Sequence, residues 1–164
     1  MARMEIKGIE EYALKLSKLG KNTEAVAGKA VYAAAGIVAD AIKENISALP
    51  EVAEVENLKA YRKGGKSGIT KRQKKGLMSS FGISKMQKDK GVYNVKLGFD
   101  GYNEIKTRKY PTGQPNQLIA RVIENGSTHM DKHPFIRPAL NQSRKAAKEA
   151  MQKVIDEETA KLMG

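Results

Sequence analysis

Few residues of the chain have side chains whose type and spacing could carry out chemistry. The group that comes closest consists of Ser127, His129, Asp131 and His133. Two histidines four residues apart can share a metal ion when both lie on a helix, and a serine, a histidine and an aspartate can form a hydrolytic triad. A glycine at 126 and a proline at 134 bracket this group, which favours a loop. We therefore expect neither a metal site nor a triad here.

The sequence also lacks other motifs of catalytic or nucleotide-binding proteins. Ser79 and Ser80 lie in LMSSFG, which lacks the glycines that flank the serine of a nucleophile elbow. The stretch GGKSG at 64–68 lacks the glycine spacing of a phosphate loop, and no apolar strand precedes it. The chain has no cysteine, which excludes a thiolate nucleophile and a zinc–thiolate site. The sequence predicts a protein without enzymatic activity and without a cofactor.

The strongest charge signal is a basic run in the middle of a chain of net charge +12. Between Glu56 and Asp89 there is no acidic residue, and the four glycines at 64, 65, 68 and 76 interrupt any helical pattern. Residues 51–76 are therefore predicted to be a flexible basic insertion that serves assembly rather than folding. Two roles stay open, a solvated mobile loop or an arm that contacts DNA phosphates or a protein partner. The candidate contact residues are Arg62, Lys63, Lys66, Lys71, Arg72, Lys74 and Lys75.

Residues 118–140 are predicted to form the corner around which the fold is organised. An apolar helix should end at a glycine that can take the left-handed conformation. Two prolines follow, and each disfavours the α conformation of the residue before it, His133 and Arg137. The phenylalanine between the prolines should fill a core gap where the sheet meets the last helix, which the second proline begins. The motif residues are Gly126, Pro134, Phe135 and Pro138.

Long helices are predicted towards both ends of the chain. An edge strand at 4–7 and a helix at 10–19 come first, and Gly20 should end that helix. The next helix should begin at residue 22 or 23 and run to about 47, with an apolar face wider than one core needs. That width predicts either cover on two sides, by a sheet and by a helix, or contact with another subunit. No window approaches the roughly 20 apolar residues of a membrane span, so no membrane contact is expected.

The last helix should run from about 138 to 162. Its acidic residues 156–158 oppose the helix dipole and need a basic neighbour. Residues 92–99 alternate as the clearest strand, a turn at 88–91 joins it to the strand before, and a third strand near 102–110 is allowed. We predict a single α+β domain over 1–164. A small antiparallel sheet should pack against long N-terminal and C-terminal helices, with a long basic loop.

The order of these pieces resembles that of the small head–tail joining, or tail-completion, family of long-tailed bacteriophages and prophages. The motifs that carry the likeness are GLMSSF at 76–81, VKLG at 95–98, IARVIENGS at 119–127 and PFIRPAL at 134–140. Family members show a similar Gly-x-Leu-x-x-Ser step, a Tyr-Ala-x-x-Val-Glu-x-Gly-Thr segment and a Pro-Phe-x-x-Pro-Ala motif. Here Ile119 replaces the usual tyrosine and Ser127 the usual threonine, and the lysine-rich insertion is outside the pattern. The likeness covers most of residues 1–155.

The resemblance implies a structural virion protein of the neck or the top of the tail, assembled in the cytoplasm of a bacterial host. It implies a ring of copies of this chain, with a hexamer as the family's usual number. It also implies contacts with portal or connector proteins and with tail tube or tail terminator proteins, and double-stranded DNA passing through is a further candidate partner. The net charge alone supports an alternative, a small basic nucleic-acid-binding module, although no helix shows a basic stripe and no aromatic platform is visible. An antitoxin- or regulator-like small protein is a third interpretation.

Overall fold

The structure is a computed structural model that describes residues 17–164. The strand expected at 4–7 and most of the helix expected at 10–19 lie outside the described residues. The described part of that helix, residues 17–21, runs past Gly20, so the expected end at this glycine is wrong. The helix continues because the backbone N–H of Asn22 still donates to the Lys18 carbonyl oxygen, at 3.2 Å.

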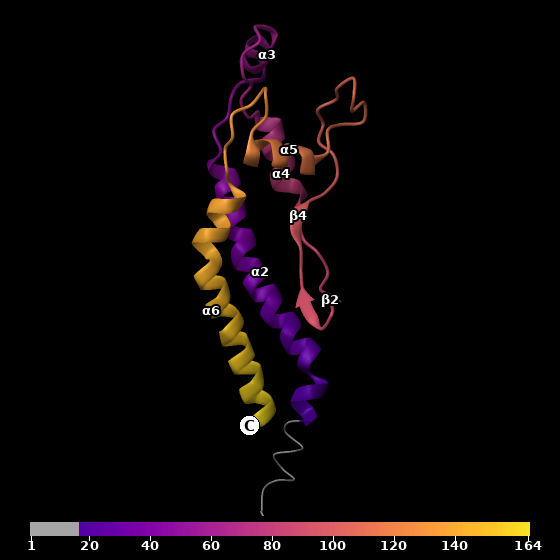
Figure 1. The fold of residues 1–164 in the computed structure, drawn as a ribbon, viewed down its shortest axis with the longest axis vertical. Coiled ribbons are helices and arrows are strands. Elements are labelled where there is room, and N and C mark those ends of the chain that lie inside the picture. The colour runs from indigo at the N-terminus through magenta and orange to yellow at the C-terminus, as the bar shows by residue number, and fades with distance from the viewer. Residues whose placement is uncertain (1–16) are drawn as a thin grey trace, which may run out of the picture.

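Two long helices form the frame of the molecule. Helix α2 (Thr23–Ala48) and helix α6 (Ile136–Met163) lie side by side and run in opposite directions (Figure 1). Three shorter helices, α3 (Glu54–Arg62), α4 (Lys71–Ser80) and α5 (Asn116–Asn125), gather at the end where α2 finishes and α6 begins. Short strands lie along another side of α2. The predicted α+β class, with a small antiparallel sheet against two long helices, is confirmed.

Close packing between α2 and α6 depends on small side chains. Ala30 of α2 is buried, as are Ser143 and Ala147 of α6. Their size lets the two helix backbones approach each other, and the Ser143 hydroxyl avoids an unpaired buried donor by donating to the Ala139 carbonyl oxygen at 2.6 Å.

An ion pair joins the far ends of these two helices. Lys29 Nζ of α2 lies 2.7 Å from Glu158 Oε2 of α6, and Lys161 Nζ lies 2.9 Å from the other carboxylate oxygen. The hydrogen bond from Lys29, and next that from Lys161, hold the pKa of Glu158 below its ordinary value. A basic neighbour for the acidic end of the last helix is therefore present, as the sequence required.

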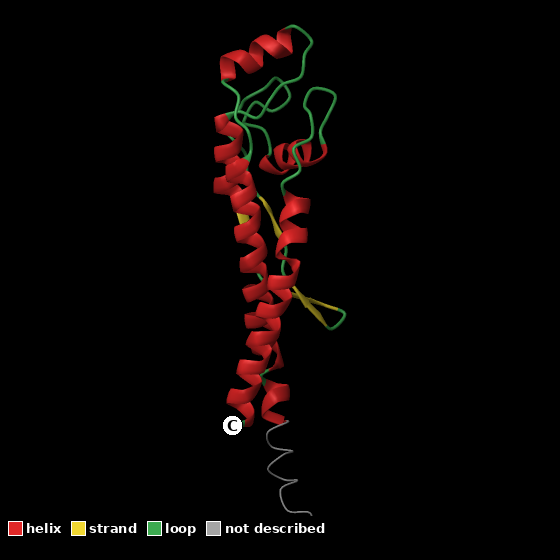
Figure 2. Ribbon diagram, turned by 90° about the vertical axis from the view of Figure 1, so that its left-hand side faces the viewer, coloured by secondary structure: helices red, strands yellow, loops and turns green. Residues whose placement is uncertain are grey.

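The strands form two short antiparallel pairs. Strand β1 (Phe81–Ile83) pairs with β4 (Leu97–Phe99), and β2 (Gln87–Asp89) pairs with β3 (Val92–Asn94). The second pair is a hairpin that projects from the body of the molecule (Figure 2), and Lys90 and Gly91 both have positive φ at its turn, as a two-residue type I′ turn requires. The predicted hairpin is thus confirmed.

The expected continuous strand over 92–99 is broken in the middle. The hydroxyl of Tyr32 on α2 accepts the backbone N–H of Met86 at 2.8 Å and donates to the Ser84 carbonyl oxygen at 3.3 Å. These bonds replace ladder hydrogen bonds and hold the hairpin against α2. Within residues 17–164 the segment near 102–110 forms no strand, and Tyr102 makes only a single bridge, to Pro115.

The prediction of an irregular loop over residues 51–76 is wrong, because this segment contains α3 and the start of α4. A reciprocal pair of bonds begins α4: the Thr70 hydroxyl accepts the Gln73 N–H, and the Gln73 side chain accepts the Thr70 N–H. Three of the four glycines fall between the helices, and Gly76 lies within α4, close to Asn103 and Asn116. A side chain there would meet the Asn116 oxygen at 2.9 Å, so the glycine serves close packing instead of breaking the helix.

Two further expectations need correction. Arg137 is helical rather than extended, because α6 begins at Ile136 and Pro138 falls in its first turn, where a missing N–H costs nothing. Helix α2 is also long and apolar enough to cross a membrane by length and composition alone, which the sequence reading denied. The same composition is typical of a core helix, and here α6 and the strands cover part of its surface.

The core lies at the end of the rod where the short helices gather. Its largest fully buried side chains are Phe135, Ile46, Ile69, Leu77 and Ile123. The ring of Phe135 is 1% exposed and packs edge-on against Phe99 at 6.0 Å between centroids, and Phe99 packs against Phe81 at 5.2 Å. The prediction that Phe135 fills the gap between the sheet and the last helix is confirmed.

Replacing Phe135 by alanine should lower the free energy of unfolding by about 3–5 kcal/mol, because it removes a fully buried ring from a close-packed site. Chemical denaturation followed by circular dichroism measures this loss. Val92→Ala is the control, since Val92 is 63% exposed and should change stability by less than ~0.5 kcal/mol. Equal stability of the two variants would contradict the core assignment.

Candidate interaction surface

The seven basic residues proposed as contacts lie at the end of the rod that holds the short helices. Arg62 closes α3, Lys63 and Lys66 follow in the connection, and the other four lie in the first half of α4. Figure 1 shows α3 as the outermost element of this end. Helix α3 has no buried residue, so its side chains are available to solvent or to a partner.

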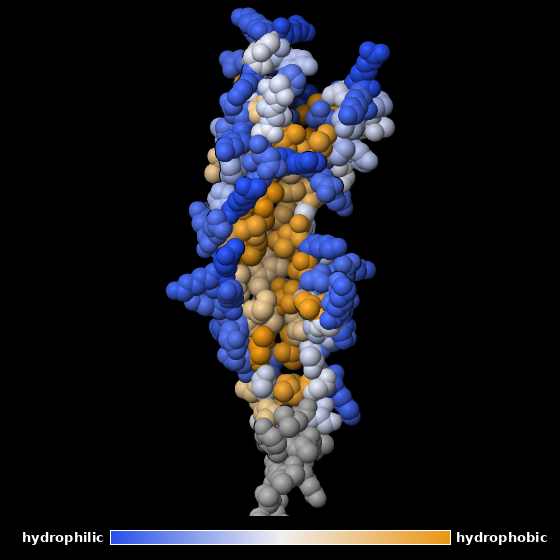
Figure 3. Space-filling model, viewed as in Figure 1, coloured by the Kyte–Doolittle hydropathy of each residue, from blue (hydrophilic) through white to orange (hydrophobic). Residues whose placement is uncertain are grey.

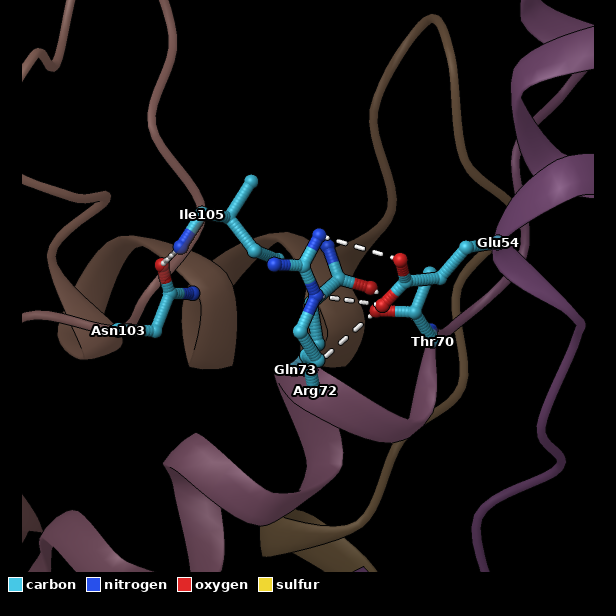
Figure 4. Close-up of polar contacts among 6 residues, drawn as sticks. All are labelled: Glu54, Thr70, Arg72, Gln73, Asn103 and Ile105. Carbon is cyan, nitrogen blue, oxygen red and sulfur yellow. Dashed lines mark hydrogen bonds and ion pairs between the residues drawn. The ribbon is translucent and has the colours of Figure 1, made fainter.

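Three of the seven are committed to ion pairs within the chain. Lys66 pairs with Asp131, Arg72 Nη2 lies 3.1 Å from Glu54 Oε2, and Lys74 Nζ lies 3.0 Å from Glu51 Oε1. Figure 4 shows the Arg72 guanidinium pointing at the Glu54 carboxylate, beside the Thr70–Gln73 cap. The Arg72 pair joins α4 to α3, the Lys74 pair joins α4 to the residues before α3, and the Lys66 pair joins the α3–α4 connection to the 127–133 loop. The three residues therefore have a structural role that their charge alone does not predict.

The other four remain as candidates for external contact. All are exposed, and none has an ion pair within residues 17–164: Arg62, Lys63, Lys71 and Lys75. Lys71 and Lys75 are four apart in α4, so they share one face of the helix. The basic surface available to a partner therefore has four residues instead of the seven that the sequence predicted, and all four are exposed.

A second basic segment, which the sequence analysis missed, lies beside this surface. The exposed residues Lys106, Arg108 and Lys109 lie in the loop between β4 and α5. Asn103 shapes this loop, because its buried side-chain oxygen accepts the N–H groups of Ile105 at 2.9 Å (Figure 4) and Gln114 at 3.2 Å. The signal was present as KTRK at 106–109, but the surrounding prolines and glycine made the segment look like a mere connection.

A hollow of about 390 Å³ separates the two basic segments. Lys71, Arg72 and Lys75 line it from α4, and Asn103 and Glu104 line it from the loop. The hollow holds both signs of charge, from Lys71, Arg72 and Lys75 and from Glu54 and Glu104. Its chemistry suits recognition of a partner surface that carries charges of both signs.

The predicted corner is built around a buried carboxylate, Glu124. Its Oε2 accepts the N–H groups of Phe135 at 2.7 Å and Ile136 at 2.8 Å, and its Oε1 accepts that of Arg137 at 3.0 Å. Gly126 ends α5 as expected, but its φ of 78° and ψ of 173° lie outside the left-handed helical region that was predicted, in a positive-φ conformation that favours glycine. Pro134 lies between that turn and the new helix. The sequence predicts Gly126, Pro134, Phe135 and Pro138 as the motif residues of this corner. It does not predict Glu124, which accepts hydrogen bonds from the N–H groups of three successive residues.

The loop histidines are not arranged for chemistry. The Ser127 hydroxyl accepts the backbone N–H of His129 at 3.2 Å, which is a turn contact and not a triad. His129 lies edge-on to Tyr61 at 5.6 Å, and Asp131 pairs with Lys66. In the part of the chain that the structure describes, no three His, Cys, Asp or Glu side chains converge on a metal position.

Comparison with protein families identifies one relationship. The model of a family described as "Bacteriophage HK97-gp10, putative tail-component" matches residues 10–126. Comparison with curated proteins and with solved structures finds no match. The matched region includes α2, the strands and α5, and it ends at Gly126.

The burial of Ile69 predicts that the basic segment contributes to folding. Ile69→Ala should lower the free energy of unfolding by about 2–5 kcal/mol, because Ile69 is 1% exposed and packs in the core. Val55→Ala is the matched control in the same segment, since Val55 is 63% exposed. A loss below ~0.5 kcal/mol for Ile69→Ala would restore the view that the segment is dispensable for the fold.

The cap on α6 gives a second prediction. Glu124→Gln keeps the shape of the side chain but replaces one acceptor oxygen by a donor and removes the charge. We expect a loss of about 2 kcal/mol of unfolding free energy, the magnitude of hydrogen bonds to a buried charged group. Glu149→Gln, at an exposed position of α6, should lower the unfolding free energy by less than ~0.5 kcal/mol, because the ion pair of Glu149 is solvated. Thermal denaturation of both variants at neutral pH tests this, and equal midpoints would refute the cap.

Proposed function

Because the chain belongs to the HK97-gp10-like family of putative bacteriophage tail components, we propose that it joins heads to tails or completes the tail, as a ring in the neck or at the top of the tail. The family makes it a structural component of the tail and of the virion. The proposal adds the place, the ring and the joining role. The family match is the observation that supports the proposal best. The elongated shape of the protomer, with charged and apolar surfaces left uncovered, agrees with it.

The exposed area supports assembly into a closed oligomer. The chain exposes 11797 Å², whereas a compact monomer of 18.0 kDa exposes about 8,000 Å². The surplus of roughly 3,700 Å² exceeds twice the ~800 Å² that one partner contributes to a standard interface. A ring protomer has two neighbours of its own kind, and in a neck it also meets the layers above and below.

We propose six copies in the ring, as the resemblance of the motifs to the joining family implies. The neighbours above and below would be portal or connector proteins and tail tube or tail terminator proteins, and assembly would take place in the host cytoplasm. No catalytic step and no cofactor form part of this role. Membrane contact is not part of it either, although α2 alone has the length and composition of a span.

The exposed basic end is proposed to bind an acidic surface on one of these neighbouring proteins. The alternative function, a small basic nucleic-acid-binding module, draws on the same four unpaired residues and on Lys106, Arg108 and Lys109. Double-stranded DNA that passes through the ring would also meet such charges. Protein contact is favoured because the basic surface surrounds a hollow that also holds Glu104 and Glu54, and a mainly acidic protein surface can place basic residues opposite these two carboxylates, whereas a phosphate chain cannot.

Neutralising the four unpaired residues separates these partners. The variant with Arg62→Gln, Lys63→Gln, Lys71→Gln and Lys75→Gln should keep the wild-type melting curve and should fail to join heads to tails. Its DNA affinity should keep the wild-type salt dependence within about one unit of slope. Four direct phosphate contacts would instead lower the log–log slope by about 3.6.

Filter binding over a salt series and electron microscopy of particles give the two measurements. The control removes the same charge elsewhere, with glutamine at Lys18, Lys21, Lys88 and Lys90, all exposed. Joining by the four-residue variant at the wild-type level, together with an unchanged slope, would rule out both partners for this surface.

A further inference from the structure

An apolar stripe on α2 is left between the two surfaces that its neighbours cover. Spaced 4, 3, 4 and 3 residues apart, as in the seam of a helix–helix contact, its residues are Ala27, Val31, Ala34, Val38 and Ala41. Gly28 and Tyr32, on a different side of α2, contact the hairpin at Met86 and Ser84. Four residues beyond Ala41 the stripe ends at Asn45, whose side chain donates to the Phe135 carbonyl oxygen at 3.0 Å, so the start of α6 covers this end of the stripe. Apart from the nearly covered Ala34, the stripe is only half-buried, although it carries no charge.

Helix α6 adds a wall of larger apolar side chains beside this stripe. Leu140 is 41% exposed, and Met151, Ile155 and Leu162 follow it at successive spacings of 11, 4 and 7 residues and are half-buried. These spacings keep all four on one side of the helix, next to the side that buries Ala147 against α2. The rest of the chain that the structure describes covers these side chains only in part.

The strands form the opposite wall. Ile83 is 37% exposed, and with Leu97 of β4 and Ile136 of α6 it lines a hollow of about 690 Å³. This hollow is lined mainly by the β1–β4 pair, α5 and the start of α6 and by no residue of α2, so it lies beside the stripe and not on it. Figure 3 shows the result as a hollowed apolar strip that follows α2 between α6 and the hairpin, with hydrophilic side chains along both flanks. We call this surface, with α2 as its floor and α6 and the β1–β4 pair as its walls, the α2 groove.

We propose that the α2 groove is the surface at which a second copy of this chain docks. This inference rests on the proposed ring and names the contact that would close it. In a ring the same groove on every copy receives a different surface of the next copy, so one groove per protomer suffices for closure. The groove is uncharged along its floor and runs along most of α2, as the apolar centre of a permanent interface requires.

The exposed area favours a copy of the chain over a lipid surface. The surplus of exposed area exceeds what two standard interfaces bury, and a ring supplies two such interfaces with copies alone. A bilayer is flat on the scale of one protein and cannot fill a concave strip whose two flanks are hydrophilic. A convex helix or strand from a neighbouring protomer can do so.

Sedimentation velocity of the full chain over a range of concentrations tests the proposal. Leu140→Glu places a charge on the wall of the groove at a position that is solvent-accessible in the protomer, so the variant should fold. We expect the wild type to associate beyond its 18.0 kDa monomer and Leu140→Glu to weaken association by roughly 100-fold, the effect of a desolvated unpaired charge. Val31→Glu, on the floor, should have the same effect.

The matched control is Gln142→Glu, which adds the same charge at an exposed position of the same helix, about 200° away from Leu140. It should associate like the wild type, and circular dichroism should show the same helix content for all variants. Three results would each overturn the proposal: a wild type that stays monomeric at about 1 mM, wild-type association of both groove variants, or binding of the wild type to anionic vesicles that Leu140→Glu abolishes while self-association persists.

Particle assembly keeps this test separate from that of the proposed function. Suppose that particles lacking the whole chain stay as separate heads and tails, but that the Leu140→Glu variant joins them normally. This result would refute the groove contact and leave the joining role intact. Joined particles in the absence of the chain would refute the joining role itself, whatever the variants do in solution.

Discussion

The arrangement of the whole molecule depends on the Glu124 carboxylate at the start of α6. The first backbone N–H groups of a helix have no partner within it, and burying them unpaired is costly. Here three successive N–H groups, from Phe135 to Arg137, donate to Glu124, and the next residue is Pro138, which has none. A helix of 28 residues can therefore begin inside the core. Since Glu124 belongs to α5, the same bonds fix α6 relative to α5.

This constraint also explains why the molecule is a rod with its core at one end. The cap places Phe135 among the residues of α4, α5 and β4, and the core cluster takes from the long helices only Ile42 and Ile46 of α2, with Leu49 just after it, and Ala139 of α6. Beyond that point the two helices continue together on small side chains and the Lys29–Glu158 pair. Two helices alone cannot surround their apolar faces, so the α2 groove follows from the same geometry that caps α6.

Sequence patterns predicted the elements whose signals are local. The turn at Lys90–Gly91, the glycine that ends α5 and the buried ring of Phe135 each follow from the properties of one or two residues. The basic segment was misjudged because its helices depend on distant partners: Glu51 and Glu54 neutralise Lys74 and Arg72, and Ile69 reaches the core. The break in the strand after Ile83 likewise depends on Tyr32, about fifty residues earlier. Pairings of that kind leave no periodic trace in a single sequence.

The two uncovered surfaces differ in the kind of partner that they suit. Exposed charges at the basic end keep their hydration and act over a Debye length of about 10 Å, so they suit an encounter whose strength depends on salt. The groove gains free energy only when water leaves it, so it suits a contact that persists once formed. The charges lie at one end of the rod and the groove along its length. A protomer that is fixed to its copies along the length, and that presents its end to a different protein, uses each surface for the contact that its chemistry favours.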